Sequence, residues 1–481
     1  MLGSRGHQQE YLLPMPIRHL RSLCCSATLG GLLVASTPAF AGPAPTSTEK
    51  PAGAANAAKG QKRSIALDMN VQQFSLANGL RVYVLEDHST PTFAMHLVYD
   101  VGSRDEEANR TGFAHLFEHM MFKGSKNVPD GGHFKHVLGV GGEMNASTAY
   151  DYTNYYNVLP SHYLDMGLWL EADRMRSLEV TDKNFENQRS AVKEEKAMRV
   201  DNVPYTNAIQ EFFAKIWKGS GYGHPPIGSL ADLDAAQTKD VQAFFSKYYV
   251  PNNAVLVLVG DVTFDEVKQK VEKYMGEIPR GPDKPKLSDV VVERNAPLEV
   301  RSEDPLARTP VYLIGWRTVP EDHPDRFAID LLGNVLLSGE SSRITKILKD
   351  QKQLALGSQF LPLNMRSAGL VAAIVLPVEG ASFDAIKQIV KDEVAKARKQ
   401  GVTAKELQKA VNQQLMDTVA TLATNRGRAF AIGFGVTQNN DPKRVLTELE
   451  RFQAVTVKDI KRVANEYFTD NWVMLEIVPK K

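Results

Sequence analysis

The sequence predicts an α+β protein of two similar domains, each with a mainly antiparallel sheet packed against helices. The prediction follows from the chain length, an internal repeat, and short helix and strand patterns in each half. The chain has 481 residues, of which 43% are hydrophobic and 23% charged, a composition typical of folded proteins and a length too great for one core. Its formal net charge of +1 gives no electrostatic reason to expect nucleic acid or an anionic membrane as a partner.

The first forty residues have the features of a secretory signal. Arg18 and Arg21 precede the weakly apolar run LCCSATLGGLLVASTPAFA, which ends in small residues, as signal peptides do. The run is too short and too interrupted to serve as a membrane anchor. We therefore expect a signal peptide over residues 1–41 and a periplasmic location in a Gram-negative bacterium, with a disordered tail and an extracellular location as alternatives. Cleavage would remove the only cysteines, Cys24 and Cys25, which excludes thiol chemistry.

Two stretches poor in hydrophobic residues divide the remaining chain. Residues 42–65 are rich in Pro, Ala, Gly and Ser/Thr and predict a flexible tether. Residues 279–289, PRGPDKPKLSD, predict a linker between a first domain at 66–278 and a second at 290–481. Near the start of the first domain, VQQFSLANGLRVYVLED predicts a hairpin with its turn at Asn78-Gly79.

The ends of the two domains resemble each other. TKDVQAFFSKYYVPNNAVLVLV (238–259) matches VKDIKRVANEYFTDNWVMLEIV (457–478) without a gap, and Tyr248 falls on Tyr467. In both segments a helical period gives way to a strand pattern. Chance similarity is the alternative, but an ungapped match over a whole helix–strand unit favours internal duplication.

The stretch HLFEHMMF, residues 115–122, carries the strongest chemical signal. On a helix, His115, Glu118 and His119 fall within an arc of about 100°, and apolar residues occupy the rest of the circumference. Imidazoles at positions i and i+4 can hold one cation and are typical zinc ligands. A glutamate beside them can accept a proton from water. The alternative is a polar trio on a solvated helix face.

A catalytic zinc requires a third protein ligand. The segment TDKNFENQRSAVKEEKAMRV (181–200) predicts a helix that begins at Thr181 or Asp182. One face of this helix is formed by Phe185, Gln188, Val192 and Glu195. Glu194 points nearly the opposite way. Because a carboxylate among apolar neighbours needs a partner, Glu195 is the better candidate for the third ligand.

The apolar part of the motif recurs in the second domain without its polar residues. GFAHLFEHMMFKG aligns approximately with RFAIDLLGNVLLSG, which places Ile329, Leu332 and Gly333 at the positions of the first histidine, the glutamate and the second histidine. We therefore expect the domain at 66–278 to be catalytic and the domain at 290–481 to have no metal site.

The motif with its third ligand resembles the inverted zinc signature H-x-x-E-H of the pitrilysin family of metallopeptidases. The resemblance extends over nearly the whole chain after the signal, through NGLRVYVLED, NASTAYDYTNYYNVLP, GHPPIGSLADL, YYVPNNAVLVLVGD and SSRITKILKDQKQLA. It implies one zinc ion per chain on His115, His119 and Glu195. It also implies that Glu118 is the general base in hydrolysis of a peptide bond.

The resemblance implies further roles around this site. Gln188 occupies a position where relatives often have a glutamate that supports one histidine. The segment GEMNASTAYDYTNYYNVL (142–159) would be an edge strand along which the substrate lies extended, with Asn145 and Ala146 at contact positions. An ordinary alternating strand is the alternative. Three other histidines match no ligand position and are expected to be structural or exposed: His133, His136 and His162.

In the family, a distant domain completes the site with an arginine and a tyrosine seven residues apart. The corresponding segment here has Lys349 and Leu356, and leucine cannot donate a hydrogen bond. The chain therefore resembles the catalytic subunit of bacterial two-chain relatives of mitochondrial processing peptidase. A zinc-free homologous partner would supply Arg and Tyr and enclose a chamber for short or unfolded peptides. The alternatives are a self-sufficient monomer or homodimer, and a non-catalytic assembly subunit.

Overall fold

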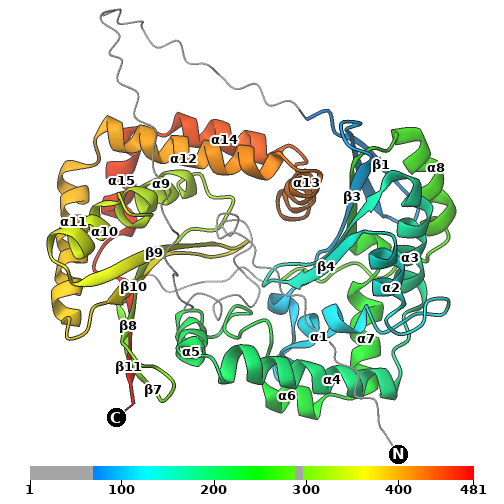
Figure 1. Ribbon diagram of the computed structural model, residues 1–481, viewed down its shortest axis with the longest axis horizontal. Coiled ribbons are helices and arrows are strands. Elements are labelled where there is room, and N and C mark those ends of the chain that lie inside the picture. The colour runs from blue at the N-terminus through cyan, green and yellow to red at the C-terminus, as the bar shows by residue number, and fades with distance from the viewer. Residues whose placement is uncertain (1–68, 288–295, 481) are drawn as a thin grey trace, which may run out of the picture.

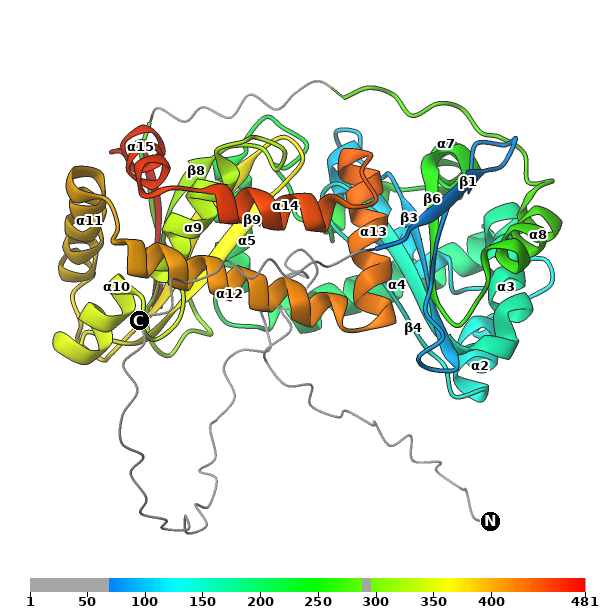
Figure 2. The same ribbon diagram turned by 90° about the horizontal axis from the view of Figure 1, so that it is seen from above.

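The computed structural model describes residues 69–287 and 296–480, which form two halves with one sheet each (Figures 1 and 2). The expected signal peptide at 1–41 and the tether at 42–65 lie outside these residues, as does the end of the 279–289 linker. Among the described helices, none is long and apolar enough to cross a membrane.

The first half contains a six-stranded sheet in the order β1-β2-β6-β3-β5-β4. Its strands are β1 (Gln72–Ser75), β2 (Arg81–Glu86), β3 (Thr92–Tyr99), β4 (Glu143–Thr148), β5 (Thr153–Pro160) and β6 (Ala254–Gly260). Only the β2–β6 pair is parallel. The predicted hairpin is confirmed, because β1 and β2 pair antiparallel on either side of Gly79, whose φ of +93° favours glycine. Strand β4 lies at the sheet edge, as predicted.

The second half repeats this topology in a five-stranded sheet of order β7-β11-β8-β10-β9. Its strands are β7 (Leu298–Asp304), β8 (Val311–Thr318), β9 (Ala355–Asn364), β10 (Gly369–Pro377) and β11 (Trp472–Pro479). Each strand after β1 has a counterpart, and the single parallel pair, β7–β11, takes the place of β2–β6. The same order and the same pair directions confirm the predicted α+β duplication.

Most helices cover one face of the sheet in their own half. In the first half they are α1 (Phe113–Met120), α2 (Gly132–Gly139), α3 (Leu164–Ser177), α4 (Asp182–Lys196), α6 (Leu230–Ala235), α7 (Thr238–Tyr248) and α8 (Phe264–Met275). In the second half they are α9 (Arg326–Leu337), α10 (Arg343–Thr345), α11 (Phe383–Gln400), α12 (Ala404–Leu422), α14 (Arg444–Ala454) and α15 (Val457–Tyr467). The two aligned segments form α7 followed by β6 and α15 followed by β11. The ungapped sequence match therefore joins equivalent helix–strand units of the two halves.

Two helices cross to the opposite half. Helix α5 (Thr206–Ile216) packs Phe212 against the second sheet, and α13 (Asn425–Asn439) packs Ile432 against the first. Figure 2 shows α13 beside β3 and β6, at the end of the arm that α12 and α14 extend from the second half. Each half therefore covers the other's second sheet face, an exchange that the sequence did not predict.

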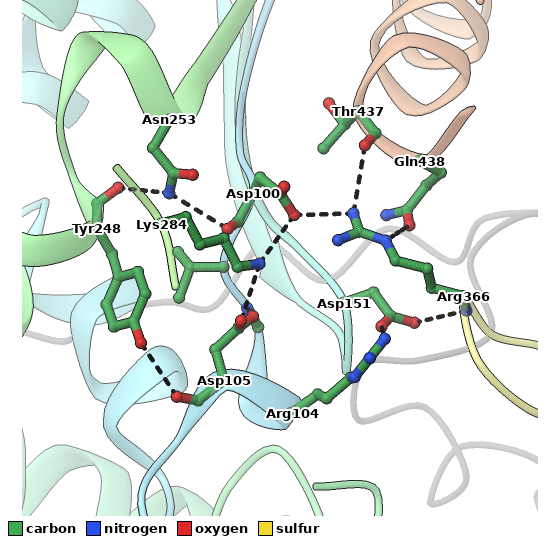
Figure 3. Close-up of polar contacts among 12 residues, drawn as sticks. Asp100, Arg104, Asp105, Asp151, Tyr248, Asn253, Lys284, Arg366, Thr437 and Gln438 are labelled. Atoms are coloured by element: carbon green, nitrogen blue, oxygen red, sulfur yellow. Dashed lines mark hydrogen bonds and ion pairs between the residues drawn. The ribbon is translucent and has the colours of Figure 1, made fainter. Parts of the chain in front are cut away.

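A buried polar cluster joins the halves near the end of β4 (Figure 3). Asp151 accepts hydrogen bonds from Tyr222 (2.8 Å), from the Arg366 backbone N–H (3.0 Å) and from the Arg104 guanidinium (3.3 Å). The Arg366 guanidinium in turn donates to Asp100 at 2.8 Å. Since Arg366 belongs to the β9–β10 turn, the second half is bonded directly to segments that flank the first half's α1 and β4.

Candidate metal centre

Two helices of the first half bring the predicted ligands together. Helix α1 begins after Gly112, and the Glu106 carboxylate accepts hydrogen bonds from the backbone N–H groups of Gly112 and Ala114, both at 2.8 Å. Helix α4 begins after Thr181, whose hydroxyl accepts from the Asn184 N–H, as predicted. Both helices place their apolar residues in one core, so their polar residues face each other at the core's margin.

His115, His119 and Glu195 converge at this margin. The Oε2 atom of Glu195 lies 3.0 Å from Nε2 of His119 and 3.5 Å from Nε2 of His115. Within the described parts of the chain, these residues form the one group of three His, Cys, Asp or Glu whose ligand atoms all lie within 4.8 Å of each other. Glu194 is exposed, as the helical spacing predicted.

The donor set fits a zinc ion. Oε2 of Glu195 is buried and accepts no hydrogen bond from any described residue, although two imidazole nitrogens face it. The other oxygen, Oε1, is bound by the Arg199 guanidinium at 2.7 Å, which leaves Oε2 for the site. Two imidazole nitrogens and one carboxylate oxygen are a common catalytic zinc set with room for a fourth ligand.

The electrostatics of the trio also suit metal binding. Burial, with the neighbouring His119, lowers the pKa of His115 to about 4, so its ring is neutral at pH 7 and able to ligate. Burial opposes ionisation of Glu195, but the contact with His119 and the charges of His115 and Arg199 outweigh it and lower the Glu195 pKa to about 2. Glu195 is therefore an anion over the whole range in which a metal would bind.

Glu118 lies next to the trio and is held by the edge strand. The Thr148 hydroxyl, at the end of β4, donates to Oε2 of Glu118 at 2.7 Å. Burial raises the pKa of Glu118 to about 7, against the opposing effects of Thr148 and His119. A carboxylate with a pKa near neutrality is suited to accept and return a proton.

The structure places the remaining predicted residues around this centre. Gln188 is buried beside His119, and its amide donates to Asn187 at 2.7 Å. Asn145 is exposed and Ala146 half-buried on β4, whose outer edge has no neighbouring strand in the described chain. The three non-ligand histidines lie away from the trio: His133 is buried against the Leu170 carbonyl, His136 contacts Trp169 and His162 contacts Tyr163.

Sequence reasoning missed three residues that shape the site. Thr148 lies inside the predicted substrate strand, but nothing in the strand pattern showed that it contacts Glu118. Glu106 lies before α1 and is separated from it by a loop. No sequence pattern predicts that a residue at this distance accepts hydrogen bonds from the start of the helix. Arg199 is one helical turn beyond Glu195, and this i, i+4 spacing could have indicated the ion pair.

The fold and the site together define the class of two-domain metallopeptidases with an inverted zinc motif. The model for "Insulinase (Peptidase family M16)" matches residues 81–225, and the model for "Peptidase M16 inactive domain" matches residues 235–414. Zinc protease PqqE of Helicobacter pylori is 31% identical over 415 residues, which cover 83% of this chain and 90% of that protein. The chain therefore belongs to peptidase family M16, the pitrilysin family.

Solved structures agree with this assignment. A protease from Helicobacter pylori superposes with a TM-score of 0.80 at 28% identity, over 85% of this chain and 100% of that one. The periplasmic protease PqqL of Escherichia coli shares the fold, with a TM-score of 0.70 at 17% identity, over 86% of this chain and 48% of PqqL. This chain thus corresponds in fold to about half of PqqL.

Proposed function

We propose that this chain is a zinc-dependent endopeptidase that cleaves short or unfolded peptides. The observation that carries the proposal is the convergence of His115, His119 and Glu195 beside the partly buried Glu118. One zinc ion, held by the two Nε2 atoms and by Oε2 of Glu195, would polarise the substrate carbonyl and activate water. Membership of family M16 and the similarity to a named zinc protease support this role.

The chain's own residues supply proton transfer and substrate alignment. Glu118 takes a proton from the attacking water and passes it to the leaving amine, and Thr148 fixes the carboxylate through Oε2. The open edge of β4 orients an extended peptide by backbone hydrogen bonds, with Asn145 and Ala146 beside it. Because Thr148 ends β4, the same strand aligns both the general base and the substrate.

The active form is a heterodimer with a zinc-free homologue, which supplies the arginine and tyrosine and closes a chamber. Two observations support this proposal. The Lys349 ammonium is paired with the Glu340 carboxylate at 2.6 Å. Leu356 is 67% exposed and has no polar group in its side chain. Neither residue can hold a scissile carbonyl as a tyrosine would. The signal-like segment at 1–41 and the likeness to a periplasmic protease support a periplasmic location. A self-sufficient enzyme is the alternative.

The test compares the purified mature chain with two site variants and one control variant. Wild type is expected to bind about one zinc per chain. Glu118→Gln is expected to bind the same amount of zinc but to lose about 10²–10⁴-fold in peptidase activity. Glu195→Gln is expected to lose zinc. Glu194→Gln, an exposed neighbour, is the control and should behave as wild type. Metal content and cleavage of a quenched peptide library are measured.

Cleavage that survives Glu118→Gln, or a chain without zinc, would overturn the peptidase proposal. Full peptidase activity of the chain alone would overturn the proposal that a partner subunit is required. Zinc binding without cleavage would be followed by addition of the zinc-free homologue, which is expected to restore activity.

A further inference from the structure

Helix α1, which carries both candidate histidine ligands, begins without a cap of its own. Its first turn follows Gly112, which has a φ of +91° and no side chain that could accept a hydrogen bond from the helix. Helices α4, α6 and α8 are instead capped by the hydroxyl of the preceding residue, which is Thr181, Ser229 and Thr263 in turn. The start of α1 therefore depends on acceptor groups from elsewhere in the chain.

Glu106 supplies these acceptors. Its Oε2 atom accepts from the Gly112 N–H and its Oε1 atom from the Ala114 N–H, both at 2.8 Å. The second of these bonds lies one residue before His115. Because both oxygens of one planar carboxyl group are used, the two bonds fix the direction of the helix start as well as its position.

The Glu106 side chain occupies an unfavourable environment. It is 0% exposed, and its one ionisable partner among the described residues is His224, whose Nδ1 atom lies 3.6 Å from Oε2. Burial raises the pKa of Glu106 well above its usual range, and the hydrogen bonds from Ala114 and Gly112 only partly oppose this effect. A serine or threonine cap would satisfy the helix at a smaller desolvation cost. The buried carboxyl group is therefore better explained by a need to fix the helix in place than by helix stability.

Glu106 is itself held in place by the two residues that precede it. Asp105 pairs with the Lys284 ammonium of the linker at 2.8 Å. Arg104 donates to Asp151 at 3.3 Å, within the cluster that joins the halves (Figure 3). Three consecutive charged residues thus connect the linker, the junction of the halves and the first turn of α1.

Residues 224–232, within the stretch GHPPIGSLADL, pack against the same turn. A Cβ atom on Gly112 would lie 2.7 Å from the Ile227 carbonyl oxygen. Asp232 accepts hydrogen bonds from the backbone N–H of Thr111, at 3.0 Å, and from the Thr111 hydroxyl. This stretch, which the sequence alone left without a role, is therefore a second support for the start of α1.

We propose that Glu106 is a positioning residue of the proposed zinc centre, on which this inference rests. By fixing the first turn of α1, Glu106 holds His115 where it and Glu195 can ligate one ion. His115 is the third residue of α1, so a shift of the first turn moves it directly, whereas His119 lies one full turn further on. Loss of a group that orients a metal ligand typically costs about 10–100-fold in metal affinity.

The test measures the zinc affinity of the full chain by competition with a chelator. In Glu106→Gln the side chain keeps its size, but its NH₂ group faces one of the two helix N–H donors. Zinc affinity is expected to fall at least about tenfold. The visible absorption spectrum of the Co²⁺-loaded chain is also expected to change, because it depends on the geometry of the ligands.

Glu86→Gln is the matched control. The Glu86 carboxylate accepts from the Phe264 N–H at 2.8 Å, so it binds the first turn of α8, a helix of the same half without a candidate ligand. This variant is expected to lower Tm, as Glu106→Gln does, but to bind Zn²⁺ and Co²⁺ as wild type does. All chains are compared at a temperature at which circular dichroism shows them to be folded without metal.

A milder variant keeps the test decisive if Glu106→Gln does not fold. Glu106→Asp retains the carboxyl group but is one methylene shorter and can reach only one of the two N–H groups. Its zinc affinity is expected to fall at least about threefold.

Zinc affinity equal to that of wild type in Glu106→Gln, or in Glu106→Asp where only that variant folds, would overturn the inference. A loss of zinc affinity in Glu86→Gln as large as that in Glu106→Gln would also overturn it. A wild-type chain that binds no zinc would instead overturn the proposed function, and this inference with it. No readout depends on peptidase activity.

Discussion

Asp151→Asn should weaken a buried polar contact between the two halves. Asp151 is 6% exposed and accepts from three segments: Arg104 before α1, Tyr222 after α5, and the Arg366 N–H in the β9–β10 turn. The amide keeps the volume of the carboxylate but replaces one acceptor oxygen with a donor. The new side-chain NH₂ group would face either the Arg366 backbone N–H or the Arg104 and Tyr222 side chains. These groups are themselves donors, so at least one hydrogen bond would be lost.

The cost of this change can be worked from those contacts. Breaking a buried ion pair by neutralising one partner costs about 3–5 kcal/mol. This range already includes the lost hydrogen bond, since a bond to a charged group contributes about 1.5–3 kcal/mol. We therefore expect the free energy of unfolding to fall by about 3–5 kcal/mol. Asp325→Asn, whose Arg462 partner is 49% exposed, should cost less, because solvent screens that ion pair.

The assay is urea unfolding followed by circular dichroism and tryptophan fluorescence. Because α5 and α13 are exchanged, we expect both probes to report one transition in wild type. A loss below about 1 kcal/mol for Asp151→Asn, or a loss equal to that of Asp325→Asn, would refute the view that Asp151 holds the junction.

Three further outcomes are expected. Gln188→Glu places a carboxylate beside His119 and should tighten zinc binding about tenfold, measured by competition with a chelator; unchanged affinity would contradict a supporting role for this position. Hydrogen bonds from Ser89, with the Arg428 guanidinium, lower the pKa of Asp87 to about 2, so its contribution is complete above the unfolded pKa of about 3.9 and is lost as pH falls towards 2. Asp87→Asn should therefore lower Tm clearly more at pH 7 than at pH 2, and an equal deficit at both pH values would speak against this account. Gly102→Ala would bring a Cβ to 2.3 Å from the Tyr150 carbonyl oxygen; because backbone must move, we expect a loss of about 1–3 kcal/mol and weaker peptidase activity, and a neutral result in thermal melts would disprove the close approach.

Local sequence patterns predicted the fold wherever the residues that contact each other are close together in the sequence. The hairpin at Asn78-Gly79, the helix after Thr181 and the repeat ending in β6 and β11 all follow from short periodicities. The metal trio was also predictable, because helical spacing fixes which side of α1 carries His115 and His119, and burial logic selects Glu195 over Glu194.

What the sequence did not predict depends on distant contacts. The bond from Thr148 to Glu118 and the exchange of α5 and α13 need the tertiary arrangement, since neither leaves a periodic trace. The approximate alignment of the second-half motif with α1 stays a prediction, because every residue of α9 is buried and the helix offers no exposed face by which to fix the register.

The helix exchange has a consequence for how the protein is made. His96, in the first sheet, bonds the backbone of Ala429 in α13 across 333 residues of chain. The first sheet therefore keeps one apolar face uncovered until nearly the whole polypeptide has been synthesised. Folding dominated by such remote contacts is slow, and an incomplete chain would lack a stable first half. The proposed protease would thus reach its folded form only after α13 has been synthesised. A chain that ends before α13 would not reach that form.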